Sequence, residues 1–100
     1  MYTFLRTEEF DAWLRALRDQ VGKARILARL RSAQLGNLGD CASVGGGVFE
    51  MRIHVGPGYR VYFAHRGNAV YRLPCGGDKG SQARDIGAAN AMAKDLEDRR

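Results

Sequence analysis

Two stretches of alternating side chains, joined by Gly56-Pro57-Gly58, constrain the fold of this chain most strongly. Successive side chains of a β-strand point to opposite faces of the sheet. In residues 50–55 apolar residues alternate with polar or charged ones, and residues 59–64 follow with the same period. Proline fixes φ and glycine tolerates positive φ, so the tripeptide suits a tight connection. The pattern predicts an antiparallel hairpin with two unlike faces.

One face of this hairpin carries most of the residues with functional chemistry. Glu50, Arg52 and His54 share that face in the first strand, and the same rule places Arg60 and Tyr62 on it in the second. Cations, an imidazole and a phenol on one face suit the binding of a polyanion and the cleavage of a phosphodiester. The opposite face, which we expect in a core, carries Met51, Ile53, Val55, Tyr59, Val61 and Phe63.

Helical periodicity and capping residues predict the N-terminal elements. A short strand over residues 2–5 precedes a helix that begins after Thr7, because a hydroxyl followed by two acidic residues is typical of a helix start. A second helix is expected after Gly22 and ends at residues 36–40. The apolar stripe assigned to the first helix consists of Phe10, Trp13, Leu14, Leu17 and Val21.

The C-terminal half predicts the rest of the sheet and a last helix. The glycines within residues 42–47 form a mobile approach to the hairpin, and a third strand is expected over residues 69–73. Residues 76–81 read as a glycine-rich turn, with Ser81 capping a helix. This order predicts one α+β domain over residues 1–100, with two consecutive helices on one face of a small antiparallel sheet.

Composition limits the classes of protein to consider. With 100 residues, 45% of them hydrophobic, the chain can form one small core without disulfides or metal. Its formal charge of +5 favours a nucleic acid or an acidic protein as partner. We expect no membrane span or signal peptide, no metal or other cofactor, and reduced thiols at Cys41 and Cys75, and therefore a cytoplasmic protein.

Several segments carry a family resemblance through their order and spacing: residues 10–14, 36–40, 50–54, 56–63 and 76–79, with Gln82 and Asp85-Ile86. Together they resemble the RelE/ParE superfamily of toxins from type II toxin–antitoxin systems, and within it the HigB-like branch of addiction module killer proteins. The resemblance covers nearly the whole chain. It implies a small antiparallel sheet with two N-terminal helices and a C-terminal helix.

The resemblance also implies an activity and partners. Well-known family members are mRNA endoribonucleases that cut messenger RNA on the ribosome without a metal. A cognate antitoxin neutralises them, and in the HigB branch it is typically a helix-turn-helix protein. By position, Arg60 matches the arginine that grips phosphate and stabilises the transition state. Arg52 and His54 fall where the family has two alternating basic residues, and Lys79 matches a further basic residue.

The last helix departs from the family pattern. Some members carry a catalytic tyrosine there, whereas this chain offers Asp85. The general base therefore stays open among His54, Asp85 and Tyr62. Tyr62 could also stack a base or simply pack at a sheet edge, and Arg52 could form a structural ion pair with Glu50 or Asp85.

Two further alternatives concern the surface and the function as a whole. The helix cations can contact RNA phosphates, although an amphipathic helix needs a solvated face in any case; they are Lys23, Arg25, Arg29 and Arg31. ParE-type relatives inhibit DNA gyrase by binding and lack the RNA-cutting residues, so a gyrase inhibitor is the main rival to the nuclease. A catalytically inactive interaction module of the same fold is the third possibility.

Overall fold

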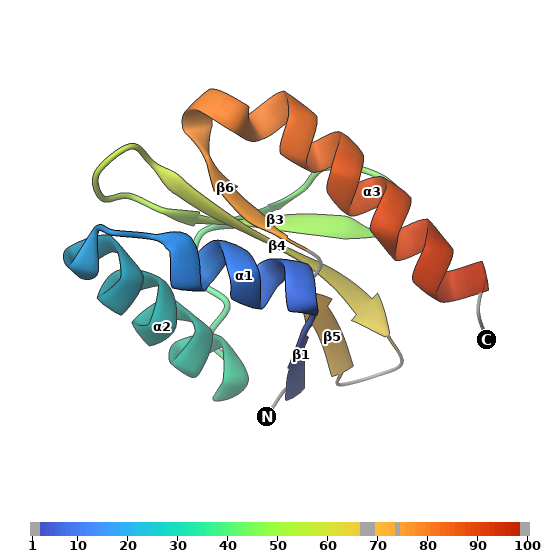
Figure 1. Cartoon of the computed structure of the whole chain (residues 1–100). Coiled ribbons are helices and arrows are strands. Elements are labelled where there is room, and N and C mark those ends of the chain that lie inside the picture. Colours follow the sequence, from blue (N-terminus) through green and yellow to red (C-terminus); the bar gives the residue numbers. More distant parts are fainter. Residues whose placement is uncertain (1–2, 67–69, 74, 99–100) are drawn as a thin grey trace.

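A computed structural model describes residues 3–66, 70–73 and 75–98 of the chain. Its elements are, in order, β1 (Thr3–Arg6), α1 (Glu8–Ala16), α2 (Gln20–Gln34), β2 (Cys41–Ser43), β3 (Val48–Ile53), β4 (Tyr59–Arg66), β5 (Val70–Leu73), β6 (Gly76–Asp78), the 3₁₀ turn η1 (Lys79–Ser81) and α3 (Gln82–Asp98). Helices α1 and α2 lie on one side of the sheet and α3 on the other (Figure 1). The predicted α+β class, with two N-terminal helices and a C-terminal helix, is confirmed.

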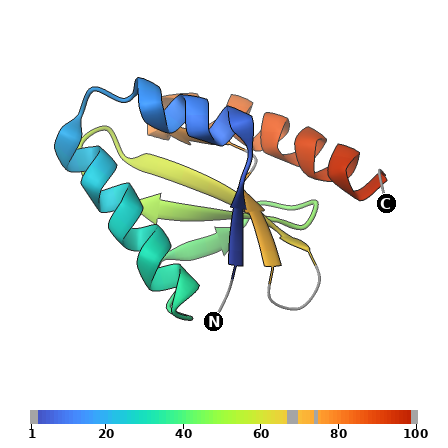
Figure 2. The same ribbon diagram turned by 60° about the horizontal axis from the view of Figure 1, so that its bottom comes forward.

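The described strands form one mixed sheet. Their order is β1-β5-β4-β3-β2. Strand β5 pairs with the C-terminal end of β4, and β6 pairs with its N-terminal end. The predicted hairpin is β3–β4, in which Arg52 lies opposite Arg60 and Glu50 opposite Tyr62. All pairs are antiparallel except β1–β5, which are parallel neighbours at one edge (Figure 2). The three predicted strands are antiparallel as expected, and the N-terminal strand adds a parallel pair at this edge. Parallel strands need a long crossover, and α1 and α2 form its first part.

Alternation along β3 and β4 divides their side chains between two cores, one on each face of the sheet. The core beneath α1 and α2 contains Phe10, Leu14, Ile26, Leu30, Met51, Ile53, Tyr59, Val61 and Phe63. The second core, beneath α3, contains Val48, Tyr62 and Ala89, with Ile86 and Ala93 against them. The predicted apolar face of the hairpin is thus confirmed, and α3 covers part of the face that carries Glu50 and Arg60.

The boundary between the first two helices differs from the prediction. The Thr7 side chain accepts a hydrogen bond from the backbone N–H of Phe10 and begins α1 as expected, but the helix ends at Ala16. Asp19 then caps α2 by accepting from the backbone N–H of Gly22. Val21 therefore belongs to the first turn of a differently oriented helix, and it is 62% exposed instead of buried.

The glycine pair Gly76-Gly77 lies in a strand, which corrects the predicted turn. A Cβ atom on Gly76 would overlap the Trp13 ring of α1, and one on Gly77 would overlap the carboxylate of Asp85 on α3. Strand β6 thus needs glycine because both faces of its backbone are in close contact. The cap of the following turn is Asp78, which exchanges hydrogen bonds with Ser81.

The approach to the hairpin is partly ordered as the edge strand β2. Strand β2 pairs antiparallel with β3, and Gly45, Gly46 and Gly47 all adopt positive φ in the connection between them. Positive φ is the reason glycine is needed there. In the portion of the chain that the structure describes, no helix is both long and apolar enough to cross a membrane.

Candidate functional site

A buried carboxylate, that of Glu50, organises the polar residues of the β3–β4 hairpin. Its Oε2 accepts hydrogen bonds from Gln82 Nε2 of α3 at 2.8 Å and from the Tyr62 hydroxyl at 3.1 Å. Its Oε1 accepts from Arg52 Nε at 3.2 Å and lies 3.5 Å from Arg60 Nη1. Glu50 therefore joins three of the predicted site residues and attaches the start of α3 to the sheet.

The protonation of this cluster follows from its hydrogen bonds. Burial disfavours the charged form of Glu50, but the hydrogen bonds from Gln82, Arg52 and Tyr62 outweigh that effect, so the pKa of Glu50 lies below its ordinary value. Burial, and then the charge of Glu50, raises the pKa of Tyr62 far above its ordinary value. Tyr62 is thus held as a neutral phenol with no exposed surface. In this conformation its ring is inaccessible for stacking on a base.

Arg60 is more enclosed than a solvated strand arginine. Its side chain is only 12% exposed, and its buried Nε has no hydrogen-bond partner among the described residues. Glu50 neutralises its charge on one side. Arg60 therefore offers little surface to a ligand, while its positive charge lies directly beside Arg52 in the sheet register.

The exposed part of the site is a second cluster, formed by His54, Asp40 and Arg52. His54 follows β3 and is 71% exposed, and its Nε2 lies 2.5 Å from Asp40 Oδ2. Asp40 precedes β2, and its other oxygen, Oδ1, lies 3.7 Å from Arg52 Nη1. The hydrogen bond from His54 lowers the pKa of Asp40 against the effect of burial, and the charge of Arg52 adds to this. An ionised carboxylate only accepts hydrogen bonds, so neutral His54 carries its proton on Nε2 and presents Nδ1 as a base.

The structure does not bring Lys79 and Asp85 into these two clusters. Lys79 is exposed at the start of η1, where its Cβ would lie 3.5 Å from a Cβ on Gly58 of the hairpin turn. The Asp85 carboxylate accepts a short hydrogen bond from Ser81 Oγ and lies over Gly77, the residue paired with Arg60. Asp85 is therefore a neighbour of the buried cluster around Glu50. It is far from His54 in the sequence and belongs to a different network of contacts.

The four cations of α2 divide between solvent and structure. Arg25 and Arg31 are exposed and Lys23 is half-buried. Arg29 points inward: its Nη1 donates to the backbone carbonyl of Arg52 at 2.5 Å and its Nη2 donates to that of Leu38 at 3.0 Å. Arg29 thus joins α2 to β3 and to the loop before β2, and its predicted contact with RNA competes with this structural role.

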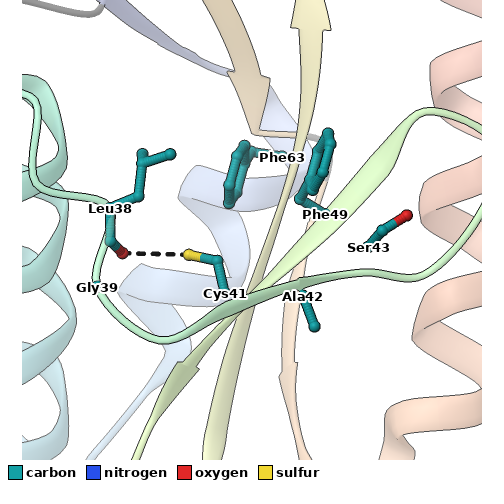
Figure 3. Close-up of a pocket in the computed structure, with 7 residues that line it drawn as sticks. All are labelled: Leu38, Gly39, Cys41, Ala42, Ser43, Phe49 and Phe63. Carbon is teal, nitrogen blue, oxygen red and sulfur yellow. Dashed lines mark hydrogen bonds between the residues drawn. The ribbon is translucent and has the colours of Figure 1, made fainter.

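Two cavities flank this part of the sheet. One, of about 340 Å³, lies at the edge strand β2 and is mainly apolar, with the stacked rings of Phe49 and Phe63 in its wall (Figure 3). The thiol of Cys41 faces the Leu38 carbonyl there and donates to it at 3.1 Å, and burial raises the pKa of this thiol. The other cavity, of about 300 Å³, lies between α2 and the end of β3 and includes His54.

Sequence reasoning missed two residues on which the site depends. Glu50 was predicted on the polar face and as a possible partner of Arg52, but not as a buried carboxylate between Arg52 and Arg60 of the paired strands. An acidic residue two positions before Arg52 on the same strand face was the available signal. Asp40 lies fourteen positions before His54, and only the β2–β3 pairing brings it close, so the sequence carried no local signal for it.

Among the described residues, no group of three or more His, Cys, Asp or Glu gathers as metal ligands.

The comparisons with known proteins show a relative across nearly the whole chain. An uncharacterized protein of Haemophilus influenzae (strain Rd) is 46% identical over 90 residues, which are 90% of this chain and 91% of that protein. The chain belongs to the family of this Haemophilus protein. No family model matches the chain. Because both chains are covered almost throughout, the two proteins are similar along the whole domain and not in a single motif.

Proposed function

We propose that this family member is a toxin of a type II toxin–antitoxin system, of the RelE/ParE superfamily and its HigB-like branch. It acts in the cytoplasm as a ribosome-dependent endoribonuclease, cutting mRNA through acid–base chemistry of its own side chains, and a cognate helix-turn-helix antitoxin neutralises it. The observation that carries the proposal is the exposed His54, oriented by Asp40 beside Arg52 on a basic domain.

His54 is the proton-transfer group in this proposal. With Nε2–H bound to Asp40, Nδ1 can take the proton of a ribose 2′-hydroxyl. The 2′-oxygen then forms a bond to phosphorus while the bond from phosphorus to the 5′-oxygen breaks, leaving a 2′,3′-cyclic phosphate. The leaving 5′-oxygen needs a proton, and its candidate donor is Lys79, which lies outside both clusters but is exposed beside Gly58 of the hairpin turn that follows His54. Asp40 acts through His54, since it fixes the tautomer and the orientation of the ring.

The cations have unequal roles. Arg52 is partly exposed and adjoins Asp40 and His54, so it is the guanidinium placed to bind the scissile phosphate. Arg60 lies beside Arg52 in the sheet register, and Glu50 partly neutralises its charge. The remaining charge of Arg60 adds to the positive potential at Arg52. Tyr62 is engaged in a buried hydrogen bond and Asp85 in a part-buried one, whereas His54 is exposed, which favours His54 among the three candidates for the base.

A ParE-like gyrase inhibitor is the second candidate, and a specific observation favours it. Two residues expected to contact RNA, Arg60 and Tyr62, expose little or no surface. A protein that acts by binding alone does not need them at the surface. The outer face of α2, with Arg25 and Arg31, would then be available to a partner protein.

The test measures mRNA cleavage in a translating extract, with cut sites mapped by primer extension, and gyrase supercoiling in parallel. We expect cleavage by the wild-type protein and a fall of roughly 10²–10⁴-fold in single-turnover rate for His54→Gln, with ribosome binding little changed. Intact mRNA together with blocked supercoiling would replace the nuclease by the gyrase inhibitor. Intact mRNA and unaffected supercoiling would point to the inactive module.

A matched pair of arginine variants tests the phosphate-binding role. Arg52→Gln and Arg15→Gln each remove one guanidinium, but Arg15 is exposed in the last turn of α1, which packs on the opposite face of the sheet. We expect slower cleavage for Arg52→Gln only. An equal effect of both variants would mean that total charge matters and that Arg52 has no local role.

A further inference from the structure

The cavity between α2 and the end of β3 has the features of a binding site for one nucleotide. Its α2 wall consists of Arg25, Ala28, Arg29 and Ser32, which recur at helical spacing and so share one face of the helix. Its β3 wall consists of Ile53, which is buried, and His54. The lining thus combines apolar side chains with two guanidinium groups, a hydroxyl and an imidazole.

The chemistry of this lining matches a ribonucleotide in three respects. Guanidinium planes and apolar side chains stack against bases, as single-stranded RNA recognition commonly requires. Arg25 is exposed and free to form paired hydrogen bonds with a phosphate. The Ser32 hydroxyl both donates and accepts hydrogen bonds, so it can meet the edge of a base.

Arg29 gives this cavity a fixed wall. The hydrogen bonds of Arg29 to the carbonyls of Arg52 and Leu38 lie in the plane of its guanidinium group and hold it in place. Its guanidinium charge adds positive potential to this wall of the cavity. A wall fixed in advance lowers the entropy that a flexible arginine would lose on binding.

We infer that this cavity binds one nucleotide of the RNA substrate, next to the scissile phosphate, with Arg25 at a phosphate and Ser32 biasing which base is accepted. The inference rests on the proposed function for its place in the reaction. Its volume, about 300 Å³, lies at the lower end of the range of roughly 300–1,000 Å³ for ligand pockets, which is consistent with a single nucleotide. His54 lines the cavity, so a nucleotide held there lies beside the imidazole that takes the 2′ proton.

The first experiment measures binding without any need for cleavage. Uridine and adenosine 3′-monophosphates, the free nucleosides and inorganic phosphate are each titrated to millimolar concentration against the ¹⁵N-labelled protein. We expect the nucleotides to shift the amides of Ala28, Ser32 and His54 at lower concentration than phosphate or nucleoside alone. Equal responses to phosphate and nucleotide would reduce the cavity to an anion-binding patch and overturn the inference, and so would shifts confined to other residues.

A matched pair of serine variants then tests the cavity in both assays. Ser32→Leu fills this cavity, whereas Ser43→Leu makes the same exchange at the apolar cavity beside β2. We expect Ser32→Leu alone to weaken nucleotide binding by about tenfold or more and to change the distribution of cut sites. Thermal melts of both variants check that each is folded, and Arg25→Gln provides a second variant on the exposed side of α2.

The outcomes separate this inference from the proposed function. Cleavage by wild-type protein with identical cut sites and rates in Ser32→Leu overturns the inference and leaves the nuclease intact. Nucleotide binding at Ser32 without cleavage supports the cavity as a nucleotide site and rejects the nuclease. If Ser43→Leu weakened nucleotide binding as much as Ser32→Leu does, the cavity between α2 and β3 would have no specific role in that binding, and the inference would be overturned.

Discussion

Replacing the buried Glu50 by glutamine is the most direct perturbation of this fold. The exchange keeps the size of the side chain but removes a charge that receives hydrogen bonds or ion pairs from four side chains. Arg52, at 37% exposed, can turn toward water, whereas Arg60 at 12% keeps an uncompensated charge. Removing one partner of a buried ion pair costs about 3–5 kcal/mol, so Glu50→Gln should lower the free energy of unfolding by about that amount.

The expected loss is large for a domain of this size. Folded domains are stable by roughly 5–15 kcal/mol, so Glu50→Gln removes a substantial fraction of the total. For 100 residues the same loss lowers the melting temperature by about 15–25 °C. Urea unfolding followed by circular dichroism measures it. The control is Glu9→Gln, the same exchange at an exposed position in the first turn of α1, which should cost less than about 1 kcal/mol.

The pH dependence provides an independent check. The folded-state pKa of Glu50 lies below the ordinary value of 4.5, so its stabilising effect is complete above pH 4.5 and is lost as pH falls through the folded-state pKa. The difference in stability between wild type and Glu50→Gln should therefore shrink in acid. A variant within about 1 kcal/mol of wild type at neutral pH, or a difference independent of pH, would refute the assignment of Glu50 as a charged structural centre.

Three further predictions concern neighbouring contacts. Tyr62→Phe should cost about 0.5–1.5 kcal/mol by urea unfolding, for one lost hydrogen bond to Glu50, and leave mRNA cleavage nearly unchanged; a severe loss of cleavage would return Tyr62 to the list of candidate bases. Gly77→Ala should destabilise by about 1–3 kcal/mol because its Cβ would overlap Asp85, and a neutral melt would contradict the close packing over β6. Asp40→Asn should slow cleavage and alter its pH–rate profile while the melting temperature changes little; an unchanged profile would exclude an effect on His54.

Local patterns predicted the elements that have local causes. The alternation in β3 and β4 follows from a period of two, and both the hairpin and the burial of Met51, Val61 and Phe63 agree with it. The start of α1 was predicted from Thr7 for the same kind of reason. Val21 was misplaced because its spacing continued the stripe of α1, although Asp19 three positions before Gly22 was a capping signal for a new helix.

Features that depend on distant contacts could not be predicted in this way. The strand β6 reads as a turn because glycine pairs are common in turns, and only the contacts with Trp13 and Asp85 explain it. The parallel pairing of β1 with β5 joins residues nearly seventy positions apart. The pairing of His54 with Asp40 likewise depends on how the short strand β2 lies along β3.

The glycine pair of β6 also places the tryptophan of this protein where its fluorescence can report on the packing of α3. Trp13, the one tryptophan in the sequence, packs on Gly76, and Asp85 of α3 packs on the next residue from the opposite face, with only backbone between them. If α3 moved away from the sheet, the backbone of β6 would lose its contact with Asp85 and could shift. The surroundings of the Trp13 indole would then change. Intrinsic fluorescence of the unmodified protein therefore provides an optical signal for the docking of α3, although the fluorophore lies on the other side of the sheet.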